Sequence, residues 1–193
     1  MVDARRPDPF AMRPARRAFW IAVILVLIVD LVGKRWVFDW LDAPAHARPG
    51  GPYGRRVWLI PGLLRLSACV NDGAAFGMGS GATMALVAVT ALLGPILVLI
   101  AYSCRAPSAP LWTLGAVTGG ALGNLYDRMF LHGVRDFLEI THPGTHNPLW
   151  AIFNFADIGI TGGVLAFLFW TLFLESRAAA APAGEGGATG NPP

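Results

Sequence analysis

The chain has 193 residues, of which 54% are hydrophobic and only 14% are charged, and its formal net charge is +3. Soluble domains usually carry about 25% charged residues, so this composition excludes an ordinary soluble domain and indicates an integral membrane protein. Its length suits a single compact bundle of membrane helices.

Residues 1–17 are rich in arginine and proline, and we expect them to form a flexible basic tail. Five arginines precede the first apolar run: Arg5, Arg6, Arg13, Arg16 and Arg17. A basic arm of this kind could bind nucleic acid. An apolar run directly after it favours a topology signal instead, because basic residues tend to stay on the cytoplasmic side of a membrane. We therefore predict a cytoplasmic N-terminus and no nucleic-acid partner.

The first membrane span is predicted at residues 18–38, and charged residues interrupt it. Asp30 and Lys34 are four residues apart with the acid first, so they can pair on one face of a helix. A cleavable signal peptide is the competing interpretation, because residues 45–47 (Ala-His-Ala) resemble a cleavage site. The apolar region of a signal peptide would not need the charged pair. We therefore favour a permanent span, with Asp30 and Lys34 in a structural role.

Residues 39–82 are predicted to form a small extramembrane β-element. Prolines and glycines fill its first part, which is typical of a loop. Two short strands are predicted at Val57–Ile60 and Leu63–Val70, on either side of Pro61 and Gly62. Asn71-Asp-Gly is a turn signal after the second strand.

Three further spans are predicted at residues 83–103, 110–131 and 150–174, each near the ~20 residues needed to cross the hydrocarbon core. The third contains a stripe of small residues that lets another helix approach closely: Gly115, Gly119 and Gly123. Residues 176–193 are rich in alanine, glycine and proline, and we expect a disordered tail. The predicted fold is therefore a mainly α membrane protein, a four-transmembrane-helix bundle at residues 18–175 with a small extramembrane β-cradle between helices 1 and 2.

Polar side chains gather where the third span ends and the fourth begins. They are Asn124, Asp127 and Arg128, then Asp136 in the link, then Asn154 and Asp157. Consecutive membrane helices run antiparallel, so these groups should converge at one face of the membrane. We expect Asp157 about six residues into the fourth helix, roughly 10 Å below its start. Ionisable residues at membrane depth are costly and usually functional.

Two acids in a low-dielectric site share a proton, because both cannot easily ionise. This state suits amide hydrolysis: the carboxylate takes a proton from water, and the carboxylic acid hydrogen-bonds the scissile carbonyl. Structural roles remain open for Asp136 and Asp157 on pattern alone. For Asp127 we favour a structural role, because a cation at Arg128 follows it directly.

Two other functions are compatible with some of these residues. His132, His142, His146 and Asp136 could bind zinc, but Pro143 and Gly144 interrupt the histidine spacing, so no metal site is predicted. A small ion- or proton-coupled transporter could use the same carboxylates. Transporters often contain inverted repeats with sites at the bilayer midplane, whereas this chain has no evident repeat and its polar groups lie at one end.

Five motifs occur in order along the chain. They are Asp30-Leu-Val-Gly-Lys34, Asn71-Asp-Gly-Ala-Ala-Phe76, Gly119-Gly-Ala-Leu-Gly-Asn-Leu-Tyr-Asp-Arg128, Gly133-Val-Arg-Asp-Phe137 and Phe153-Asn-Phe-Ala-Asp157. With them, residues 18–175 resemble the lipoprotein signal peptidases (signal peptidase II), which are bacterial membrane aspartyl proteases. The segments 39–56 and 141–150 look longer than is usual in that family.

The resemblance implies that Asp136 and Asp157 are the catalytic dyad. It implies a supporting set around them: Asn71, Gly120, Asn124, Arg128, Asn154 and Ala156. It also implies a diacylglyceryl-modified prolipoprotein as substrate, cut just before its lipidated cysteine, with no cofactor. We expect a monomer among the lipids of the bacterial cytoplasmic (inner) membrane, with both termini cytoplasmic and the active site near the outer face.

Overall fold

The computed structural model describes residues 13–42, 56–73, 83–103 and 108–175. Its helices are α1 (Arg13–Asp42), α2 (Thr83–Ser103), α3 (Ser108–Leu131) and α4 (Phe155–Phe169), and α4 continues into π-helical turns, η3 (Trp170–Glu175). The strands are β1 (Arg56–Ile60), β2 (Leu64–Asn71) and β3 (Val134–Ile140). Most of both predicted tails, residues 1–12 and 176–193, lies outside the described residues.

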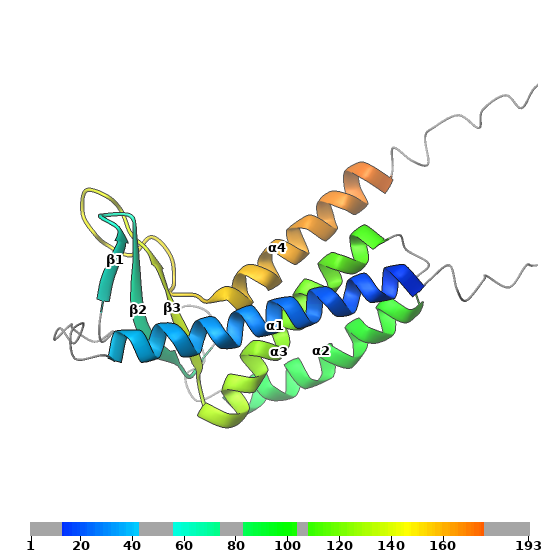
Figure 1. Ribbon diagram of the computed structural model, residues 1–193, viewed down its shortest axis with the longest axis horizontal. Helices are drawn as coiled ribbons and strands as arrows, with labels where there is room; N and C mark the ends of the chain where they lie inside the picture. The colour runs from blue at the N-terminus through cyan, green and yellow to red at the C-terminus, as the bar shows by residue number, and fades with distance from the viewer. Residues whose placement is uncertain (1–12, 43–55, 74–82, 104–107, 176–193) are drawn as a thin grey trace, which may run out of the picture.

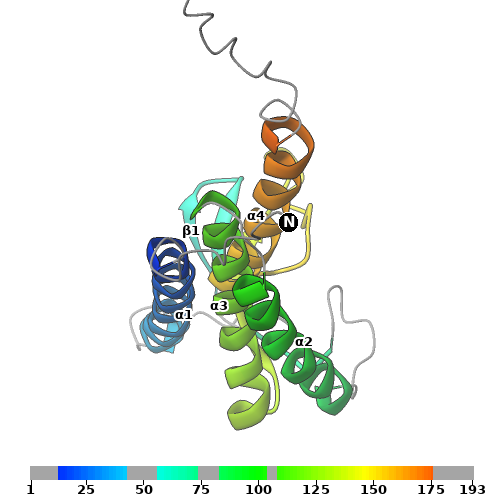
Figure 2. The same cartoon turned by 90° about the vertical axis from the view of Figure 1, so that its right-hand side faces the viewer.

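Helix α3 lies at the centre of the bundle and packs against α1, α2 and α4 (Figures 1 and 2). The predicted glycine stripe faces α1: a Cβ atom added at Gly119 would lie 2.5 Å from the carbonyl oxygen of Val23, and one at Gly115 would meet that of Phe19. On the other side of α3, a Cβ atom at Gly120 would meet the carbonyl oxygen of Ala156 in α4. Small residues therefore let α3 approach two helices at backbone distance.

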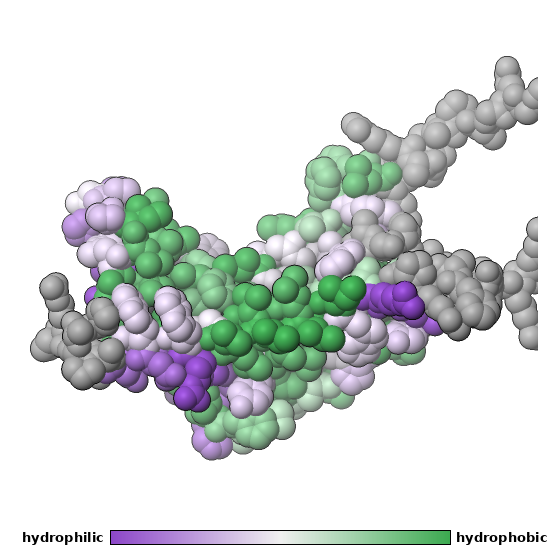
Figure 3. Space-filling view, viewed as in Figure 1, coloured by the Kyte–Doolittle hydropathy of each residue, from purple (hydrophilic) through white to green (hydrophobic). Residues whose placement is uncertain are grey.

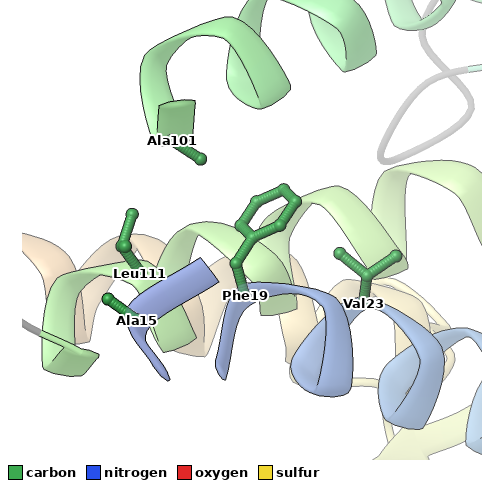
Figure 4. Packing of buried hydrophobic residues seen from close by; sticks show 5 residues of the cluster. All are labelled: Ala15, Phe19, Val23, Ala101 and Leu111. Atoms are coloured by element: carbon green, nitrogen blue, oxygen red, sulfur yellow. The ribbon is translucent and has the colours of Figure 1, made fainter. Parts of the chain in front are cut away.

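Within the part of the chain that the structure describes, two helices are long and apolar enough to cross a membrane, Met84–Ser103 and Phe155–Leu174. Hydrophobic residues cover the helical body in Figure 3, and hydrophilic residues gather toward its two ends. The start of α1, the end of α2, the start of α3 and the end of α4 lie at one end of the bundle, and the sheet lies at the other (Figure 1). At the end without the sheet, α1, α2 and α3 meet around a buried core shown in Figure 4: Ala15, Phe19, Val23, Ala101 and Leu111.

The three strands form one antiparallel sheet in the order β1-β2-β3. Strands β1 and β2 agree closely with the two predicted strands. The third strand was not predicted: it comes from the link between α3 and α4, so the sheet is not built from the segment between helices 1 and 2 alone. Strand β3 pairs with β2 so that Cys69 lies opposite Asp136 and Asn71 lies opposite Val134. This pairing puts one aspartate of the predicted dyad on the sheet.

Three helix boundaries differ from the predicted spans. Helix α1 begins at Arg13 rather than near residue 18, so the last five residues of the predicted flexible tail are helical. It extends to Asp42 rather than ending near residue 38, and its last turns contain an Arg35–Asp39 ion pair at 2.8 Å. Helix α4 starts at Phe155 rather than near residue 150. The residues before it are held in extended pairing, because Phe153 and Leu138 exchange backbone hydrogen bonds of 2.8 and 3.0 Å.

Candidate active site

The first turn of α4 is fixed by a capping box. Asn154 is the N-cap residue, and its side-chain oxygen accepts a hydrogen bond of 3.0 Å from the backbone N–H of Asp157. The Asp157 carboxylate in turn accepts one of 3.0 Å from the backbone N–H of Asn154. Asp157 therefore lies in the first turn of the helix, and the expected depth of roughly 10 Å below the helix start was wrong. Negative charge is favoured at this position by the helix dipole.

Asp136 lies on β3 and is almost completely buried. Its Oδ1 atom accepts a hydrogen bond of 2.6 Å from the side-chain amide of Asn154, and its Oδ2 atom accepts one of 3.2 Å from Asn71 on β2. The pairing of β2 with β3 brings Asn71 to Asp136, and the N-cap position of α4 brings Asn154 to it. Elements far apart in the sequence thus converge on one carboxyl group.

Asn154 links the two aspartates, since its side chain donates to Asp136 while its backbone N–H donates to Asp157. Asn124 of α3 completes the arrangement. Its Nδ2 atom donates to Asp157 at 2.9 Å, and its Oδ1 atom accepts from Asn154 at 3.1 Å. The predicted convergence of the third span, the link and the fourth span is therefore found in the structure.

The pKa of Asp136 is raised from its ordinary value of 3.8 to about 7, chiefly by burial and also by the nearby charge of Asp157. The hydrogen bonds from Asn71 and Asn154 act in the opposite direction and are included in this value. A carboxyl group with a pKa of about 7 can hold a proton at neutral pH and give it up during a reaction.

A buried cluster of charges lies directly behind Asn124. The Lys34 ammonium is 2.7 Å from Asp30 and 3.3 Å from Asp127, and it donates a hydrogen bond of 2.9 Å to Oδ1 of Asn124. The side chains of all three charged residues are fully buried. Asp30 also accepts a hydrogen bond of 2.8 Å from the backbone N–H of Ala156 in α4. The predicted Asp30–Lys34 pair is therefore present, and it contacts α4 as well.

The cation that pairs closely with Asp127 is not its sequence neighbour Arg128. Asp127 makes its close ion pair with Arg135 at 2.7 Å and also accepts the backbone N–H of Arg135 at 3.0 Å. Arg128 instead donates to the carbonyl oxygen of Asn124 at 3.4 Å. Neighbours on a helix point in different directions, so Asp127 turns inward toward the start of β3. Arg135 is a structural residue that the sequence reasoning missed, although it lies inside one of the five motifs.

Two of the three histidines considered above for a zinc site make other contacts. His142 accepts backbone N–H groups of Gly144 and Thr145 through Nδ1, and the ring of His146 contacts that of Trp58. Over the described ranges 13–42, 56–73, 83–103 and 108–175, no group of three His, Cys, Asp or Glu side chains is arranged to hold a metal ion.

A cavity of about 500 Å³ opens beside Asp136. One wall is the sheet, and the other is the segment that leads from β3 to α4. The lining residues are Cys69, Val70, Asn71, Asp72, Asp136, Glu139, Pro148, Leu149, Trp150, Ala151 and Ile152. Leu149 and Trp150 leave more than half of their surface exposed. The cavity therefore joins a buried acid to an apolar rim, and the rim residues were not predicted.

The sequence profile described as signal peptidase (SPase) II matches residues 22–173. The chain belongs to the signal peptidase II family. It is 37% identical over 153 residues to a lipoprotein signal peptidase of Syntrophomonas wolfei, covering 78% of this chain and 90% of the relative. It is 34% identical over 171 residues to one of Moorella thermoacetica, covering 88% and 97%. These relatives do not favour the transporter alternative.

The fold has relatives among solved structures. One is a bacterial membrane enzyme determined by the in meso method at 2.3 Å resolution, with a TM-score of 0.66, 24% identity, and coverage of 84% of this chain and 90% of that one. A second, determined at 1.9 Å, has a TM-score of 0.63 at the same identity and covers 79% and 91%. At this identity the likeness establishes the fold, and membership of the signal peptidase II family comes from the sequence.

Proposed function

We propose that Asp136 and Asp157 are the catalytic dyad with which this member of the signal peptidase II family removes signal peptides from prolipoproteins. One observation carries the assignment: Asn154 donates to Asp136 at 2.6 Å and to Asp157 at 3.0 Å, so a single residue holds both acids. Among the described residues of this site, no other two acids accept hydrogen bonds from one shared residue.

The two acids take different parts in hydrolysis. Asp157 takes a proton from water, and the water oxygen attacks the scissile carbonyl carbon. Asp136, with its raised pKa of about 7, gives its proton to the carbonyl oxygen as the tetrahedral diol forms. The peptide C–N bond then breaks: the leaving nitrogen takes the proton held by Asp157, and one hydroxyl of the diol returns its proton to Asp136. The carbonyl side leaves as a carboxylic acid, and both aspartates are back in their starting protonation states. No covalent enzyme intermediate and no metal ion is needed.

The supporting residues act through the dyad. Asn71, Asn124 and Asn154 orient the two carboxyl groups by the hydrogen bonds described above. Gly120 and Ala156 let α3 and α4 approach at backbone distance, which keeps Asn124 within reach of Asp157. Arg128 donates to the carbonyl of Asn124 and supplies positive charge beside the site.

The peptidase domain at residues 18–175 crosses the membrane four times, through α1, α2, α3 and α4. Support comes from the side chains of α1 that face away from the bundle, such as Ile24, Ile28 and Val32, which are apolar and exposed. The basic start of α1 is cytoplasmic, so both termini are cytoplasmic and the dyad lies near the outer face. The enzyme is a monomer in the bacterial inner membrane.

The substrate is a prolipoprotein whose cysteine carries a diacylglyceryl group, and the cut falls just before that cysteine. The cavity beside Asp136 supports this assignment, because its rim residues Leu149 and Trp150 offer exposed apolar surface next to the acid. Such a rim suits a peptide that enters sideways from the lipid with its acyl chains attached.

Cleavage of a lipidated synthetic peptide by the purified protein tests the proposal. Asp136→Asn and Asp157→Asn should each lower turnover at least about 10²-fold, the smaller contribution expected of general acid–base catalysis, with unchanged melting. Asp39→Asn is the matched control, because Asp39 is exposed and its ion pair among the described residues is with Arg35 in the same helix. Wild-type turnover in either dyad variant would show that the assignment is wrong.

A further inference from the structure

A long apolar groove lies between α2 and α3, and α1 closes one end of it. Its volume is about 620 Å³. The wall includes Ala91, Gly94 and Leu99 of α2 and Leu122 of α3. Two threonines also line it, but Thr90 and Thr118 turn their hydroxyls back to carbonyl oxygens of their own helices. These two threonines therefore offer no free hydroxyl hydrogen to a ligand.

The groove has the length of one membrane leaflet. Its lining residues on α2 run from Thr90 to Tyr102, which is roughly 18 Å at 1.5 Å per residue. Half of a hydrocarbon core about 30 Å thick is ~15 Å. The volume falls in the range of about 300–1,000 Å³ found for small-ligand sites. It suits an extended acyl chain better than a helix of about 10 Å diameter.

A basic, aromatic cluster lies at the mouth of the groove, where α1 begins and α2 ends. Trp20 donates a hydrogen bond of 3.2 Å to the hydroxyl of Tyr102, and the Arg16 guanidinium lies 4.6 Å from the centre of the Tyr102 ring. Trp20 and Tyr102 line both the groove and an adjoining hollow of about 410 Å³, which Arg16 and Arg17 also line. Tryptophan and tyrosine favour the level of the lipid headgroups.

The Arg16 guanidinium is short of acceptors. Its one hydrogen bond among the described residues is a long one, 3.4 Å to the carbonyl oxygen of Tyr102, and its buried Nε has no partner there. A guanidinium offers five N–H groups and binds phosphate in a bidentate manner. Arg17 beside it is exposed. Charge and donor geometry at this mouth therefore match an anionic phosphate group.

We propose that this groove binds an anionic glycerophospholipid, with one acyl chain along α2 and the headgroup phosphate on Arg16 and Arg17. The mouth of the groove lies at the end of the bundle opposite the dyad, and its inner end reaches Leu125 of α3, next to Asn124. A glycerophospholipid contains no peptide bond, so the lipid is not the substrate. It fills the space between α2 and the rest of the bundle.

Lipid binding by the purified protein tests this site without reference to catalysis. Phosphatidylglycerol and phosphatidylcholine with the same acyl chains are titrated separately and counted by native mass spectrometry. Phosphatidylglycerol should bind at least about fivefold more tightly, the factor expected when one basic side chain meets an anionic lipid. Arg16→Gln should remove about that factor for phosphatidylglycerol and leave phosphatidylcholine unchanged.

Two glycines provide a test variant and a matched control variant for binding in the groove. A Cβ atom at either Gly94 or Gly162 would meet no atom within 4 Å, but only Gly94 lines the groove. Gly94→Leu should therefore weaken binding of both lipids at least about tenfold, and leucine is a better helix former than glycine. Gly162→Leu should bind both lipids as the wild type does.

Arg35→Gln is the control for charge, because Arg35 is exposed and lies toward the other end of α1. It should leave the preference for phosphatidylglycerol intact. Equal affinity of the wild type for the two lipids would overturn the headgroup assignment, and so would an unchanged preference in Arg16→Gln. Unchanged binding by Gly94→Leu would overturn the groove. None of these three results would bear on the dyad, since cleavage is not measured.

Discussion

The hydrogen bond from Asn71 to Asp136 controls how strongly Asp136 holds its proton. The side-chain amide of Asn71 lies 3.2 Å from Oδ2 of Asp136 and lowers the pKa of that carboxyl. Burial raises the same pKa more strongly, and the net value is about 7. A donor stabilises the charged form of an acid, so its removal favours the neutral form. Asn71→Ala should therefore raise the pKa of Asp136 further.

The size of the shift follows from the strength of one hydrogen bond. Bonds to charged groups contribute about 1.5–3 kcal/mol, and 3.2 Å is at the long end of the usual range. We take the low end, ~1.5 kcal/mol, which is about one pH unit. Asp136 acts as the acid and loses this role as the pH rises through its pKa. The alkaline limb of kcat/KM should thus move from about pH 7 to about pH 8.

The assay is cleavage of a fluorogenic lipidated peptide over the neutral and alkaline range. Asn71→Ala should be slower at its optimum, because Asp136 is less well oriented, yet it should retain activity at a higher pH than the wild type does. Asn147→Ala is the control, since Asn147 is exposed in the segment between β3 and α4 and should leave the limb in place. A limb that stays fixed or moves to lower pH in Asn71→Ala would refute Asp136 as the acid.

Three further outcomes are expected. Activity should survive metal chelators, and a loss that zinc restores would return the histidines to consideration. Reporter fusions should place both termini and the α2–α3 connection in the cytoplasm and residues 40–80 outside; an external C-terminus would contradict four spans. Asp127→Asn should lower the melting temperature, because breaking a buried ion pair typically costs about 3–5 kcal/mol. Cleavage per folded molecule should stay within about tenfold of wild type, and a stable but inactive variant would place Asp127 among the catalytic residues.

Local pattern was enough to predict the helices and the first two strands. Helix α2 agrees with the predicted span because it carries no charge and its ends are marked by turn-forming residues. The convergence of the residues around the proposed dyad was predictable in outline, since antiparallel helices bring Asn124 and Asp157 to one face. Asn154-Phe-Ala-Asp157 followed by an apolar run is also a recognisable capping-box pattern, which would have corrected the start of α4.

Strand β3 could not be predicted from local pattern. Most of its residues are buried on both faces, so the alternation that identifies a half-exposed strand is missing. Its place in the sheet depends on pairing with β2, more than sixty residues earlier in the chain. The same long-range pairing decides the partner of Asp136, namely Asn71. For Asp127, the sequence neighbour Arg128 was a poor guide because only the three-dimensional turn after α3 brings Arg135 back to it.

The charged cluster behind Asn124 influences the site through orientation. It contains two acidic and two basic side chains, Asp30 and Asp127 with Lys34 and Arg135, so its formal charges cancel. Lys34 donates to the Oδ1 atom of Asn124, and this oxygen cannot then face Asp157. The Nδ2 atom must point there instead, as its 2.9 Å hydrogen bond to the Asp157 carboxylate requires. The buried charges of α1 and α3 make both helices less apolar. These same charges fix the orientation of the Asn124 amide beside Asp157, the proposed base.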